Sequence, residues 1–206
     1  MNLPNALSLT RIFLVPLMLV VMLTGNFPNR EVWGLVIFLA AAMTDFLDGY
    51  LARRRSQVTT VGKLLDPVAD KILISATFVA LVELGVIPAW AVVIVIGREF
   101  AVTGLRAIAS SEGLTIDASR LGKYKMVAQV VCCSFLIAGI PYPQSSLTMV
   151  GEILLWLVVV LAISSMAHYF RVFWGQIDES AKARRRLEGR ITPPSRKSDA
   201  DALIKP

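Results

Sequence analysis

The stretch TDFLDGYLAR, residues 44–53, governs how the rest of the chain is interpreted. It ends a long apolar run, and it holds two carboxylates three residues apart. A similar pair, four residues apart, follows in GKLLDPVAD, residues 62–70. On a helix, residues three or four apart lie on the same side, so the carboxylates of each pair project together. The two pairs are Asp45 with Asp48 and Asp66 with Asp70.

The composition is that of a membrane protein. The chain has 206 residues, of which 55% are hydrophobic and 17% charged, against ~25% charged in soluble domains. Its mean hydropathy is +0.64. Several apolar segments approach the ~20 residues that cross a bilayer. We therefore predict an all-α integral membrane protein with six transmembrane helices, at 12–25, 32–52, 64–84, 88–109, 121–140 and 147–173.

The positive charges predict the orientation. Net charge is +6, and almost all basic residues fall in the segments 53–63 and 106–125 and in the tail from Arg171. The three loops on the opposite side of the membrane, which join the first helix to the second, the third to the fourth and the fifth to the sixth, carry one basic residue, Arg30. Basic loops stay on the cytoplasmic side, so we expect both termini in the cytoplasm and the protein in the cytoplasmic membrane. We attribute the basicity to this bias and to anionic lipid, and expect no nucleic-acid partner.

Two regions follow from this pattern. Residues 1–175 form the predicted membrane domain. Residues 176–206 are basic and contain the stretch TPPS, residues 192–195, so we predict a mostly disordered cytoplasmic tail held near lipid headgroups.

Four carboxylates that meet at one membrane face need compensating positive charge. Mg²⁺ or Mn²⁺ would supply it, and two such ions can clamp a phosphate undergoing displacement. Arg53 and the hydroxyl of Thr59 are suited to a phosphate, and Gly49 and Gly62 leave room for it. Two other interpretations remain: the aspartates are solvated helix caps, or they line the ion pathway of a cation transporter.

The order of these residues resembles the signature of the CDP-alcohol phosphatidyltransferases. That signature is Asp-x-x-Asp-Gly-x-x-Ala-Arg, eight residues, then Gly-x-x-x-Asp-x-x-x-Asp, and the chain matches every fixed position from Asp45 to Asp70. The resemblance implies a six-helix membrane enzyme, usually a homodimer. Such an enzyme transfers the phosphatidyl group of CDP-diacylglycerol to an alcohol and releases CMP.

The resemblance also implies roles for individual residues. Asp45, Asp48, Asp66 and Asp70 would hold two divalent cations, and Asp70 would also be the general base. The residues assigned to CDP-diacylglycerol binding are Asn5, Thr10, Gly49, Ala52, Arg53, Thr59 and Gly62.

The acceptor alcohol is inferred from later cations. Arg98 lies beside Glu99 in an apolar run, and Glu99 cannot neutralise Arg98, Arg106 and Lys123 together, which favours a phosphorylated acceptor. The stretches GREF, 97–100, and LGKYK, 121–125, are similar to those of family members that use the 1-hydroxyl of sn-glycerol 3-phosphate and form phosphatidylglycerophosphate. The residues assigned to the acceptor phosphate are Arg98, Arg106, Lys123, Arg120 and Lys125.

Alternatives to this assignment stay open. The acceptor could be an inositol phosphate, or phosphatidylglycerol in cardiolipin synthesis. Arg98 could form a purely structural pair with Glu99, and Arg120 and Lys125 could serve only to anchor the chain on the cytoplasmic side.

Overall fold

The computed structural model of the chain describes residues 3–25, 27–55, 60–111 and 120–191, and these form six α-helices. Side chains are described within these ranges except at 3–8, 45–55, 60–67, 70, 120–124 and 179–191. The all-helical prediction with six helices is confirmed. The helices are α1 (Leu3–Leu23), α2 (Arg30–Arg55), α3 (Thr60–Glu83), α4 (Ala89–Ser111), α5 (Arg120–Gly139) and α6 (Ser146–Ile191).

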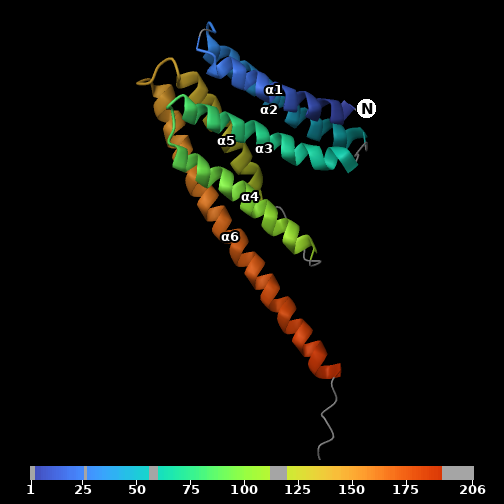
Figure 1. The fold of residues 1–206 in the computed structure, drawn as a ribbon. Helices are drawn as coiled ribbons and strands as arrows, with labels where there is room; N and C mark the ends of the chain where they lie inside the picture. The colour runs from blue at the N-terminus through green and yellow to red at the C-terminus, as the bar shows by residue number, and fades with distance from the viewer. Residues whose placement is uncertain (1–2, 26, 56–59, 112–119, 192–206) are drawn as a thin grey trace, which may run out of the picture.

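The helices are arranged so that the two carboxylate-bearing segments come near each other. Helix α1 packs against α2 and α3, α2 also contacts α3, and α6 packs against α4 and α5. The chain's N-terminus, the C-terminal end of α2 and the N-terminal end of α3 lie at one end of the molecule (Figure 1). Helix α6 runs far beyond the other helices (Figure 1).

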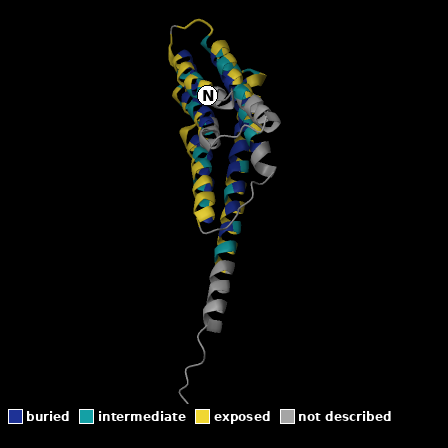
Figure 2. Cartoon of the chain, turned by 90° about the vertical axis from the view of Figure 1, so that its right-hand side faces the viewer, coloured by how far each residue is buried: buried dark blue, intermediate teal, exposed yellow. Residues whose placement is uncertain are grey.

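Apolar side chains fill the interior and also cover the outside. Met18, Phe38, Phe78 and Leu136 are completely buried between the helices. Exposed and buried positions alternate along the helices of the bundle (Figure 2). Every helix also carries a large apolar side chain that is more than half exposed. Examples, one from each helix, are Phe13, Trp33, Val79, Val93, Val127 and Val160. Apolar surface of this extent is unusual in water and suits a lipid environment.

Length and composition single out one helix region. Of the described residues, Ser146–Asp178 is the stretch that is long and apolar enough to cross a membrane by these two criteria alone. Leu9–Leu23 and Lys125–Gly139 are apolar but shorter.

The predicted disorder of the tail is wrong for residues 176–191. Helix α6 continues without a break to Ile191. The segment 179–191 consists largely of Ala, Leu, Glu, Lys and Arg, which favour helix, and it extends a helix that is already nucleated. The rest of the predicted tail, 192–206, lies outside the described residues.

Gly85 closes α3 and sets the turn into α4. Its φ is +70°, a left-handed conformation in which a Cβ is strained. The amide of Val86 donates to the carbonyl of Leu81 at 2.9 Å, and that of Gly85 donates to Val82 at 2.9 Å. These two hydrogen bonds satisfy carbonyls at the helix end in the manner of a Schellman motif. The turn thereby directs α4 back along α3.

We predict that Gly85→Ala lowers the free energy of unfolding by about 1–2 kcal/mol, because the left-handed backbone is unfavourable for alanine. The measurement is unfolding of the purified protein in detergent. Gly25→Ala is the matched control, since an added Cβ at Gly25 meets no atom within 4 Å and its φ is not left-handed. Equal stability of the two variants would contradict the prediction.

Candidate active site

The four aspartates of the signature lie on two helices that contact each other. Asp45 and Asp48 are in α2, and Asp66 and Asp70 are in α3. Their side chains lie outside the described residues, so their convergence stays a prediction. Among the side chains that are described, no group of three or more His, Cys, Asp or Glu could hold a metal ion. The donor set itself, four carboxylates at helical spacing on two adjacent helices, fits a pair of hard divalent cations.

Of the residues assigned to CDP-diacylglycerol binding, the structure describes the side chain of Thr10 alone. Thr10, in the first half of α1, has an exposed side chain. Thr59 lies outside the described residues. The remaining assigned residues lie in described helices, but their side chains are not described: Asn5, Gly49, Ala52, Arg53 and Gly62.

Arg98 is held from two sides. It lies in α4 with 6% of its surface exposed, and its Nη1 is 3.3 Å from Oε2 of Glu99. Its Nη2 donates a hydrogen bond to the hydroxyl of Ser165 in α6. Its guanidinium carbon lies 5.7 Å from the centre of the Tyr169 ring, also in α6, within the range of a cation–π interaction. These contacts fix both the position and the plane of the guanidinium group.

Glu99 joins two cations. Besides Arg98, its carboxylate forms an ion pair with Nζ of Lys125, which lies in α5 and is 5% exposed. The structure therefore brings Arg98 and Lys125 together around one acid. The expected pair between Arg98 and Glu99 exists, but it is part of a larger cluster that ties α4 to α5 and α6.

The other acceptor residues are not brought into this cluster. Arg106 lies two turns along α4 from Arg98, is exposed, and forms no hydrogen bond or ion pair with the described residues. Arg120 and Lys123 lie in the first turn of α5, where side chains are not described.

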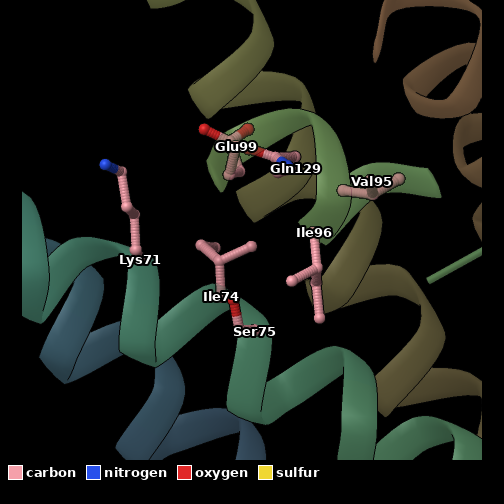
Figure 3. Close-up of a pocket in the computed structure, with 7 residues that line it drawn as sticks. All are labelled: Lys71, Ile74, Ser75, Val95, Ile96, Glu99 and Gln129. Carbon is pink, nitrogen blue, oxygen red and sulfur yellow. The ribbon is translucent and has the colours of Figure 1, made fainter. Parts of the chain in front are cut away.

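A small pocket lies beside the cluster, between α3, α4 and α5. Its volume is about 20 Å³. Glu99 and Gln129 stand close together on one side, and Lys71 and Ser75 line the pocket from α3 (Figure 3). The side chain of Lys71 donates to Oγ1 of Thr103 at 2.6 Å, which links α3 to α4. The full lining is Lys71, Ile74, Ser75, Val95, Ile96, Glu99 and Gln129.

Sequence reasoning missed several of these residues. Ser165, Tyr169 and Gln129 carry no motif, and their roles depend on contacts with distant parts of the chain. The available signals were weak: Gln129 is a lone amide in an apolar helix, one turn after Lys125. Arg11 gave a clearer signal, since a charge inside an apolar run has to be accommodated, and its side chain is completely buried in α1.

Comparison with known proteins identifies the family. The sequence pattern that defines "CDP-alcohol phosphatidyltransferase" matches residues 1–164. The chain belongs to this family. It is therefore a CDP-alcohol phosphatidyltransferase, an enzyme of phospholipid biosynthesis that is bound to membranes.

Similar proteins carry two kinds of name. The chain is 37% identical to a CDP-diacylglycerol–glycerol-3-phosphate 3-phosphatidyltransferase of Bacillus subtilis, over 87% of this chain and 98% of the relative. It is 36% identical to a protein of the same name from Rickettsia felis, over 82% and 94%. It is also 34% identical to a cardiolipin synthase (CMP-forming) of Oryza sativa, over 84% of this chain but 58% of that protein.

We predict that Glu99→Gln lowers the free energy of unfolding by about 3 kcal/mol, because two buried cations lose the carboxylate that they share. Unfolding in detergent measures the effect. Glu152→Gln is the control, since Glu152 is exposed on α6 and forms no ion pair with the described residues. A loss no larger than that of the control would show that the cluster contributes little to stability.

Proposed function

We propose that the protein transfers the phosphatidyl group of CDP-diacylglycerol to the 1-hydroxyl of sn-glycerol 3-phosphate, giving phosphatidylglycerophosphate and CMP. One structural observation carries the choice of acceptor: Arg98 and Lys125, both buried, gather around the single carboxylate of Glu99. A phosphate group that docks here adds negative charge to a site rich in buried cations. The names of the relatives from B. subtilis and R. felis support the same acceptor.

The reaction is a displacement at phosphorus. The oxygen of the acceptor 1-hydroxyl bonds to the phosphorus of the phosphatidyl group, and the bond from that phosphorus to the CMP oxygen breaks. Asp70 accepts the hydroxyl proton, and Arg53 binds the pyrophosphate. Two Mg²⁺ or Mn²⁺ ions, held by Asp45, Asp48, Asp66 and Asp70, would neutralise negative charge on the pyrophosphate.

Arg98 and Lys125 position the acceptor. An arginine can bind a phosphate with two parallel N–H bonds, and such a contact orients as well as attracts. Because α6 holds the guanidinium of Arg98 through Ser165 and Tyr169, little side-chain freedom remains to be lost on binding. Arg106, Lys123 and Arg120 would attract the acceptor from the cytoplasmic side.

The membrane arrangement is part of the proposal. All six helices cross the cytoplasmic membrane, both termini face the cytoplasm, and the active site opens to that side. The support is the apolar exterior of every helix and the concentration of basic residues in the proposed cytoplasmic segments. A homodimer remains a prediction from the family.

The deciding experiment is CMP release from CDP-diacylglycerol by the purified protein in detergent with Mg²⁺. We expect release with sn-glycerol 3-phosphate, but not with inositol 1-phosphate, serine or phosphatidylglycerol. Asp70→Asn should lower the rate by about 100- to 10,000-fold, and a metal chelator should abolish it. Release with phosphatidylglycerol instead would favour cardiolipin synthesis. No release with any of these acceptors, from folded protein, would contradict the proposed acceptor.

A second prediction concerns Ser165. Ser165→Ala should raise KM for sn-glycerol 3-phosphate roughly tenfold with a smaller effect on kcat, because the guanidinium of Arg98 loses the hydrogen bond that orients it. Ser165→Thr restores a hydroxyl and should recover most of the affinity. Ser164→Ala is the control, since Ser164 is exposed and its one hydrogen bond to the described residues is to the carbonyl of Leu161 in its own helix. A change in stability without a change in KM would reject the positioning role.

A further inference from the structure

Gln129 presents an unusual buried amide. Its side chain is 5% exposed, and its Nε2 is buried without a hydrogen bond to any of the described residues. A buried donor left without a hydrogen bond is unfavourable, and the surrounding apolar side chains cannot accept one. The amide lines the small pocket between α3, α4 and α5. An oxygen atom that enters this pocket would relieve the cost.

The size of the pocket limits what can enter. Its volume of about 20 Å³ leaves room for a group the size of one water molecule or one hydroxyl. The side chains of Ile74, Val95 and Ile96 form apolar walls, so a ligand can form hydrogen bonds only with the few polar side chains of the lining (Figure 3). A single hydroxyl group or one water molecule therefore fits this pocket.

The polar groups of the pocket offer both an acceptor and a donor to a ligand. The carboxylate of Glu99 accepts hydrogen bonds, and Nε2 of Gln129 donates one. An ionised phosphate oxygen can only accept hydrogen bonds, whereas a hydroxyl can donate to Glu99 and accept from Gln129 at once. The hydroxyl of Ser75 can complete the site from α3. A hydroxyl group and a water molecule share this chemistry.

The pocket adjoins the proposed acceptor site. Glu99 follows Arg98 in α4, and Gln129 lies one turn beyond Lys125 in α5. On α3, Lys71 follows Asp70 directly. In the proposed function, the phosphate of sn-glycerol 3-phosphate binds Arg98 and Lys125, and its 1-hydroxyl reaches the base. The secondary hydroxyl is then the one polar group of this acceptor that has no binding partner.

We propose that this pocket binds the secondary hydroxyl of the acceptor, through Gln129 and Glu99, and so selects a vicinal diol phosphate over a simple hydroxyalkyl phosphate. This inference rests on the proposed function. Selection follows because a buried site built to bond a hydroxyl is left with unpaired groups when the hydroxyl is missing. Gln129 is a binding residue in this proposal and takes no part in proton transfer.

The test compares sn-glycerol 3-phosphate with 3-hydroxypropyl phosphate, which keeps the reacting hydroxyl and the phosphate but lacks the secondary hydroxyl. We expect the wild-type enzyme to use the second acceptor with kcat/KM at least tenfold lower. Gln129→Met, an unbranched apolar replacement, should lower kcat/KM for sn-glycerol 3-phosphate by a similar factor and leave 3-hydroxypropyl phosphate within twofold. Gln144→Met, at an exposed turn residue, is the control and should change neither.

Each alternative gives a different result. If the pocket holds only water, Gln129→Met changes both acceptors equally, and the proposal fails. Equal use of both acceptors by the wild-type enzyme also overturns it, and this arm needs no variant to fold. Ser75→Ala offers a second variant, for which we expect a smaller but equally selective loss. If CMP is released with neither acceptor but with another alcohol, the proposed function fails as well.

Discussion

A charge inside an apolar helix bundle has to be surrounded by opposite charge or by hydrogen bonds, and Glu99 meets this requirement for two cations at once. Its carboxylate contacts Arg98 in its own helix and Lys125 in α5. Arg98 extends the contact to α6 through Ser165 and Tyr169. The relative placement of three helices therefore depends on how one carboxylate is satisfied. Apolar packing alone would tolerate small rotations that this arrangement resists.

The same cluster connects the two halves of the proposed active site. Helix α3 carries Asp66 and Asp70, and its Lys71 bonds Thr103 of α4. Thr103 in turn donates to the backbone carbonyl of Glu99 at 2.7 Å. The helix assigned to the metals and the helix assigned to the acceptor phosphate are thus joined by short polar contacts. Such rigidity suits a reaction in which catalysis consists mainly of holding two phosphate-bearing substrates in line.

The sequence predicts the helices of this protein better than it predicts their contacts. Apolar runs and local turn signals such as Gly85 predict most helix ends to within about four residues, but α1 begins at Leu3, well before the predicted start at residue 12. The sequence also predicts the ion pair between Arg98 and Glu99, because the two residues are adjacent in the chain. Ser165, by contrast, meets Arg98 from 67 residues away, and no periodicity encodes such a contact. The helical continuation of α6 to Ile191 was missed because polar, charged composition was interpreted as disorder although the same residues favour helix.

The order in which the chain is made gives the neighbouring pair a further consequence. Synthesis proceeds from the N-terminus, so α4 leaves the ribosome before α5 and well before Ser165 and Tyr169. An arginine that enters the membrane alone is costly. In the proposed membrane arrangement, Arg98 would enter the bilayer with the carboxylate of Glu99 beside it in the same helix, as a nearly neutral pair. In that arrangement, the adjacency of Arg98 and Glu99 lowers the cost of inserting α4 before α5 and α6 have been made.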